Sequence, residues 1–132
     1  KNAIIEPMTK VSKTASGIIA HASGDNVSHA KLCWQGGTAN KSGSAFITDP
    51  EEKLKFIQEC KIKQRESIMV MSNNPDVTAE DRIVLENYLT LLEQSDWSSI
   101  EGFRAFLVMD NQYSGFNQEL KIKGEGPKIR NN

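Results

Sequence analysis

The feature that most restricts the fold is a sharp helix start in the middle of the chain, Asp49-Pro50-Glu51-Glu52. The Asp49 carboxylate can accept hydrogen bonds from unpaired backbone N–H groups, proline suits the first helical position, and acidic residues favour the positive end of the helix dipole. Apolar residues then recur at helical spacing as far as Met71, and Asn73-Asn74-Pro75 ends the pattern. The sequence therefore predicts a helix over about residues 50–72.

Two polar residues, Lys61 and Gln64, interrupt the apolar stripe of this predicted helix. A stripe that faces a core is normally continuous. Either the middle of the helix is exposed to solvent, or these two side chains meet polar partners, and the sequence leaves both alternatives open.

Two further helices follow the first. Thr78 begins one over about residues 79–94, whose apolar face is unusually wide, and Ser98 with Glu101 forms a capping box before another over about 99–111. Gly102 lies in the first turn of the last helix and weakens it by roughly 1 kcal/mol relative to Ala. Three amphipathic helices joined by short loops predict a small antiparallel helical assembly.

We therefore expect a mainly α fold in a single domain that spans residues 1–132. Residues 49–112 form the predicted helical core, and residues 124–132 a flexible tail. Residues 1–48 are rich in Gly, Ser, Thr and Asn, so they are expected to be loop-rich, adding either a helix or short strands.

Chemistry-bearing side chains recur at every fourth position in this N-terminal part: His21, Asp25, His29 and Cys33. In a helix, neighbouring members of this ladder could share a metal ion, so a small enzyme or metal-binding domain is one alternative. The intervening residues, among them Gly24, disfavour a helix, however. Both histidines also precede Cys33, which excludes the papain order of nucleophile and base. We expect a loop here, with no catalytic residue, metal or cofactor assigned.

The two cysteines, Cys33 and Cys60, allow two interpretations. The sequence begins at Lys1 and not at Met, and a processed N-terminus would place the protein outside the cytoplasm, secreted or periplasmic. A disulfide between the two cysteines is expected there, whereas a reducing compartment would keep both as thiols.

The overall charge excludes some partners. The formal net charge is -1, with an excess of acids in residues 49–101, so nothing predicts a nucleic-acid-binding protein. No apolar stretch approaches the roughly 20 residues of a membrane-spanning helix. The expected partner is therefore another protein.

Four aromatic residues at the edges of predicted elements are the candidate contacts for that partner: Trp34, Trp97, Tyr113 and Phe116. Because every catalytic pattern lacks a required residue, the leading hypothesis is a non-enzymatic protein–protein interaction module of the adaptor, inhibitor, immunity factor or secreted effector type. The remaining alternative is a structural subunit of a larger assembly, with the oligomeric state open.

Overall fold

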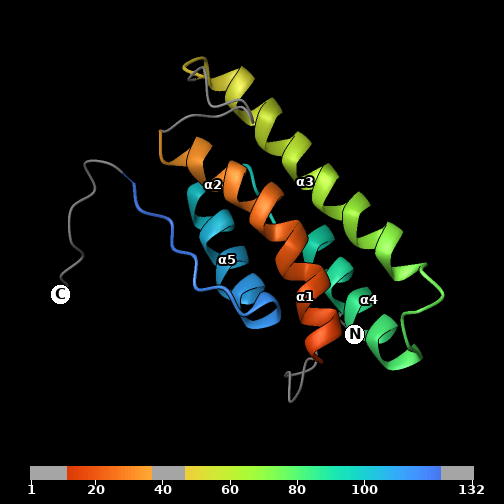
Figure 1. The fold of residues 1–132 in the computed structure, drawn as a ribbon. Helices are drawn as coiled ribbons and strands as arrows, with labels where there is room; N and C mark the ends of the chain where they lie inside the picture. Colours follow the sequence, from red (N-terminus) through yellow and green to blue (C-terminus); the bar gives the residue numbers. More distant parts are fainter. Residues whose placement is uncertain (1–11, 37–46, 123–132) are drawn as a thin grey trace.

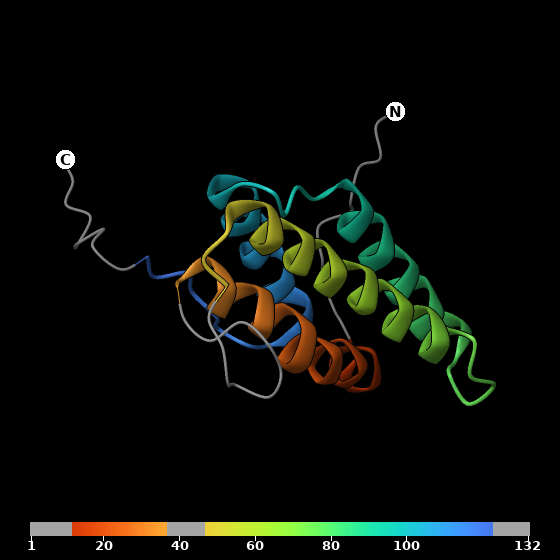
Figure 2. The same ribbon diagram turned by 90° about the horizontal axis from the view of Figure 1, so that it is seen from above.

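The computed structural model describes residues 12–36 and 47–122, and these form an antiparallel bundle of helices. The first helix is built from three segments joined end to end: α1 (Lys13–Ala22), the π-helical segment η1 (Ser23–Val27) and α2 (Ser28–Trp34). It is followed by α3 (Pro50–Ser72), α4 (Ala79–Gln94) and α5 (Ile100–Ser114). Successive helices run in opposite directions (Figure 1), and α3 lies against both the first helix and α4 (Figures 1 and 2). The predicted mainly α assembly is confirmed.

Helices α3 and α4 begin at the capping residues that the sequence predicts. Asp49 accepts a hydrogen bond from the Glu52 backbone N–H at 3.0 Å, and Thr78 caps α4 in the same way. The start of α5 lies one residue beyond the predicted one, because Ser99, and not Ser98, accepts from the backbone N–H of Gly102 at 3.0 Å.

Gly102 weakens α5 but is required by the turn that precedes it. A Cβ atom at this position would lie 2.3 Å from the backbone oxygen of Asp96. Glycine is therefore needed here despite its low helix propensity, because the chain between α4 and α5 passes close to the start of α5.

Residues 13–34 are helical throughout, so the N-terminal part adds a helix, which was one of its two alternatives, and the loop expected over residues 21–33 is not formed. Their core-facing positions do recur at helical spacing, but the residues there are mostly small or polar, so the apolar signal is weak. The buried residues of this helix are Ala15, Ile19, Ala22, Ser23, Asn26, Val27, Ala30 and Cys33. The η1 segment accommodates one extra residue through its wider turn.

The C-terminal strap, residues 115–122, returns along α5 without regular secondary structure (Figure 1). Among the described residues, the regular secondary structure consists of helices and includes no strand. The predicted flexible tail at 124–132 and most of the candidate N-terminal strands lie outside the described residues.

The core is aromatic toward the end where α4 meets α5. Trp97 packs edge-on against Phe103, with 5.0 Å between ring centroids, and its indole N–H donates to Ser95 at 2.9 Å. Tyr88, Phe106 and Tyr113 continue the cluster between α4 and α5. Burial of such large rings supplies much of the hydrophobic stabilisation of a small domain. No helix in the described part of the chain is both long and apolar enough to cross a membrane.

Candidate functional site

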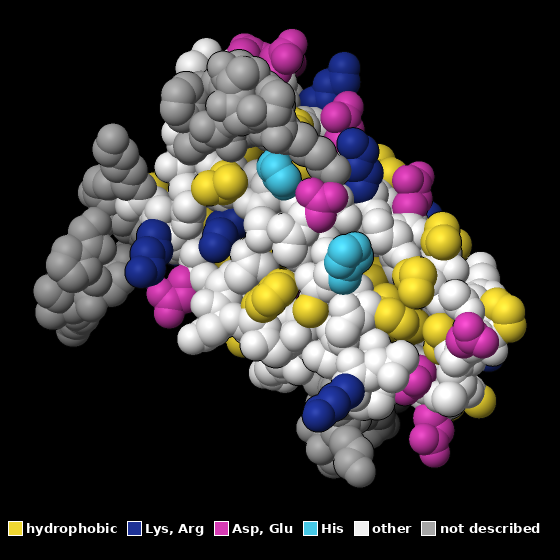
Figure 3. All heavy atoms as spheres, viewed as in Figure 1, with side chains coloured by type: hydrophobic (Ala, Val, Ile, Leu, Met, Phe, Trp, Pro, Cys, Tyr) yellow, Lys and Arg dark blue, Asp and Glu magenta, His cyan; other side chains and the backbone are white. Residues whose placement is uncertain are grey.

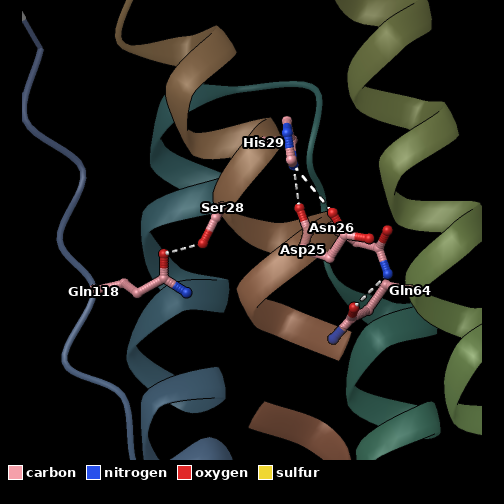
Figure 4. Close-up of polar contacts among 6 residues, drawn as sticks. All are labelled: Asp25, Asn26, Ser28, His29, Gln64 and Gln118. Atoms are coloured by element: carbon pink, nitrogen blue, oxygen red, sulfur yellow. Dashed lines mark hydrogen bonds and ion pairs between the residues drawn. The ribbon is translucent and has the colours of Figure 1, made fainter. Parts of the chain in front are cut away.

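The His–Asp–Cys ladder is not gathered into a site. His21 and Asp25 are exposed, His29 is half-buried and Cys33 is buried, so the four side chains do not share one environment along the first helix. His29 donates to the backbone oxygen of Asp25, and its Nδ1 lies 3.4 Å from the Asp25 carboxylate (Figure 4). No group of three or more metal-binding side chains occurs within residues 12–36 and 47–122.

Cys33 and Cys60 form no disulfide, which corrects the bridged alternative. Both are buried, one on α2 and one on α3. Burial raises the pKa of the Cys33 thiol, an effect that Lys53 only partly offsets. Since the thiolate is the nucleophilic form, Cys33 is poorly suited to covalent chemistry.

A buried polar cluster, which the sequence did not reveal, lies at the centre of the bundle. The amide nitrogen of Gln64 donates to Ser23 at 2.9 Å and to Tyr88 at 2.8 Å, and its oxygen accepts from Asn26 at 3.1 Å. Figure 4 shows Asn26 reaching from the first helix to Gln64 on α3.

Lys61, the other polar residue that interrupts the apolar stripe of α3, donates to the backbone oxygen of Ser95 at 2.6 Å. Of the two alternatives for the interrupted stripe of α3, the one with polar partners is therefore correct.

Asp110 completes this cluster from α5. One carboxylate oxygen accepts from Ser23 at 2.9 Å and from Tyr88 at 2.6 Å, while Oδ2 has no hydrogen-bond partner among the described residues. Burial raises the pKa of Asp110 to about 6 despite these two bonds, which act in the opposite direction. Burial, and then the nearby Asp110 carboxylate, raise the pKa of Tyr88 well above its usual value. The cluster ties η1, α3, α4 and α5 together, which is a structural task.

The four candidate aromatic residues occupy different environments. Trp97 and Tyr113 are buried, with Tyr113 only 1% exposed. Trp34 is half-buried and donates from its indole N–H to the backbone oxygen of Trp97 at 3.1 Å. Phe116 is 40% exposed. Phe116 is therefore the member of this set that presents an aromatic ring to solvent.

Phe116 lies at one end of a groove of about 850 Å³ between the first helix and the C-terminal strap. We call it the strap groove. The helix contributes Gly24, Ser28, Lys31 and Gln35, and the strap contributes residues 116–119 and Lys121. Over α2 and the strap, the surface seen in Figure 3 is largely polar.

Side chains on both sides hold the strap in place. On the α5 side, the Asn111 amide donates to the backbone oxygen of Gln118 at 3.0 Å and accepts from its N–H at 3.1 Å. On the α2 side, Ser28 donates to the Gln118 side chain at 3.2 Å (Figure 4), and Gln35 accepts from the backbone N–H of Lys121 at 2.8 Å. The groove is therefore formed by a fixed segment of chain.

An exposed apolar surface lies on α3, where Ile62, Met69 and Val70 share one side of the helix. Ile83 of α4 is also exposed. None of these four residues lines the strap groove. The strap groove is the stronger candidate, because it combines an exposed aromatic ring with polar and charged groups.

No family model, curated protein or solved structure matches the chain.

Proposed function

We propose that this protein is a non-enzymatic interaction module that binds another protein at the strap groove. The observation that carries the proposal is Phe116, an aromatic side chain 40% exposed at the edge of a groove otherwise lined by polar residues. Aromatic anchors surrounded by polar groups are typical of the energetic centres of protein interfaces.

The local structure supports Phe116 as a preorganised contact. Its ring lies over Gly24, where an added Cβ would be 3.7 Å from the ring. Its backbone N–H donates to Ser114 at 3.1 Å, and Gly115 ends α5 in the left-handed conformation with φ 81°. A ring held in this way loses little conformational entropy when a partner covers it.

The alternative of a small enzyme or metal-binding domain receives less support. Its four residues, His21, Asp25, His29 and Cys33, are spread from the surface to the core of the first helix. The buried Cys33 thiol has a raised pKa, and His29 is already engaged by Asp25. An adaptor, inhibitor, immunity factor or secreted effector remains the type of protein that we propose.

The proposal is tested by capture from a lysate of the source organism with wild-type protein and two variants as bait. Phe116→Ala removes the proposed anchor, and Ile83→Ala removes an apolar side chain on α4 that is 58% exposed and away from the groove. We expect Phe116→Ala to lose the partner by about tenfold or more, and Ile83→Ala to retain it. Equal capture by all three folded proteins would contradict the proposal.

A further inference from the structure

The C-terminal strap has the alternation of an extended strand. Asn117, Glu119 and Lys121 are exposed, whereas Gln118 is half-buried and Leu120 is buried. Side chains on an extended backbone point to opposite faces in turn. The strap therefore presents every second residue to the body of the protein, although it pairs with no other strand in the described structure.

The backbone groups of the strap alternate in the same way, between α5 and α2. Both backbone groups of Gln118 bond to Asn111 of α5, and the backbone oxygen of Leu120 accepts from Arg104 of α5 at 3.1 Å. The N–H of Lys121 points the other way, to Gln35 beyond α2.

Two residues of the strap thus present a vacant strand edge to the groove. By the same alternation, the backbone N–H and C=O groups of Asn117 and Glu119 face the side of α2, where the strap groove lies. They make no hydrogen bond to another described residue. An edge of this kind is a template for an added strand, whose main-chain hydrogen bonds supply affinity while side-chain contacts supply specificity.

The charges of the groove favour an acidic occupant. Lys31 and Lys121 line it, and the single acid there, Glu119, lies 3.9 Å from the Lys121 amine. The acidic residues of the chain are concentrated elsewhere, in α3 and α4. Complementary charge guides encounter and selects between otherwise similar partners.

If the protein is an interaction module, as proposed above, the geometry points to its ligand: an extended acidic peptide segment that adds as a strand along the strap. Its main chain pairs with Asn117 and Glu119. An apolar side chain packs on Phe116, and carboxylates lie beside Lys31 and Lys121.

The test measures binding of labelled peptides to the full chain by fluorescence anisotropy. The first probe is a peptide of about eight residues that alternates Glu and Val, a typical strand length. The second has Lys in place of Glu, and the third carries N-methyl groups at alternate residues of the Glu peptide, which removes the main-chain donors on one edge. We expect the Glu peptide to bind about tenfold more tightly than either of the others, a difference of about 1.4 kcal/mol.

Variants sharpen the result. Lys31→Glu should weaken binding of the Glu peptide about tenfold. Lys63→Glu, an equal charge change at an exposed position on α3, should leave it unchanged. The inference would be overturned if the affinity were the same with and without N-methylation or for both peptide charges, or if no peptide bound at concentrations up to about 1 mM. Should Phe116→Ala still lose an intact partner in that case, the interaction module would stand and strand addition alone would fail.

Discussion

The first helix and the α3–α5 region reach helical structure by different routes. Helices α3, α4 and α5 begin at side-chain caps and bury large residues such as Leu85, Leu92 and Phe106. The first helix also has a cap, Ser12, but it buries mostly small residues, and two of its buried side chains, Ser23 and Asn26, are polar. Its place in the bundle therefore depends on polar partners that other helices supply.

The strongest test of this difference between the two regions is a substitution of Gln64, the α3 residue with which Ser23 and Asn26 form hydrogen bonds. Gln64→Ala removes three buried hydrogen bonds and opens a cavity, and we expect it to lower the free energy of unfolding by about 3–5 kcal/mol. Gln58→Ala, the same change at an exposed position of α3, should alter it by less than about 0.5 kcal/mol. Urea denaturation measures both, and similar losses would show that the polar cluster is unimportant.

The dependence of stability on pH tests the same cluster through Asp110. Its pKa rises from 3.8 to about 6 on folding, so the folded protein binds this proton more tightly than the unfolded chain does. Stability should therefore fall as the pH rises from about 4 to about 6, by roughly 3 kcal/mol from this group.

Asp110→Asn cannot ionise, which isolates that contribution from the other acids. The difference in unfolding free energy between the wild type and Asp110→Asn should change across this pH range in favour of the variant. Parallel profiles for the two proteins would show that Asp110 keeps an ordinary pKa in the fold.

The smallest effects come from one glycine in each region, and they should have opposite signs. Gly102→Ala places a Cβ against the backbone of Asp96 and should destabilise by about 1–3 kcal/mol. Gly17→Ala, in α1, meets no atom within 4 Å and should stabilise by about 0.5–1 kcal/mol through better helix propensity. Thermal unfolding followed by circular dichroism measures both, and the same sign for both would contradict the described environments.

The contrast also explains which parts of the fold the sequence could predict. Caps such as Asp49 and Thr78 combine with large apolar residues, so two helices were placed within a residue of their ends. The last helix was expected to end at 111 but continues to Ser114, which buries Tyr113. For the N-terminal part, the sequence leaves a helix and short strands as alternatives, and Gly24 and its polar neighbours favour a loop. Burial and hydrogen bonding in the tertiary structure override that local preference.

The sequence predicts less of the candidate site than of the fold. The sequence indicates Phe116 as an aromatic residue near a glycine, but its groove depends on contacts such as that of Ser28 with Gln118, 90 positions apart. Likewise, Gln64 interrupts the apolar stripe in the sequence, but its hydrogen-bond partners lie on other helices. Only the assembled bundle brings these residues together.

The π-helical segment, finally, has a consequence for how this chain could tolerate insertions and deletions. A π turn holds one residue more than an α turn, so loss of one residue within Ser23–Val27 could restore a regular α-helix. Because the wider π turn already absorbs that residue, the deletion would leave the faces of α1 and α2 in nearly the same relative orientation. Ser28, Lys31 and Gln35 would then stay beside the strap groove. The same deletion within α3, which is a regular α-helix, would instead rotate everything beyond it by about 100°.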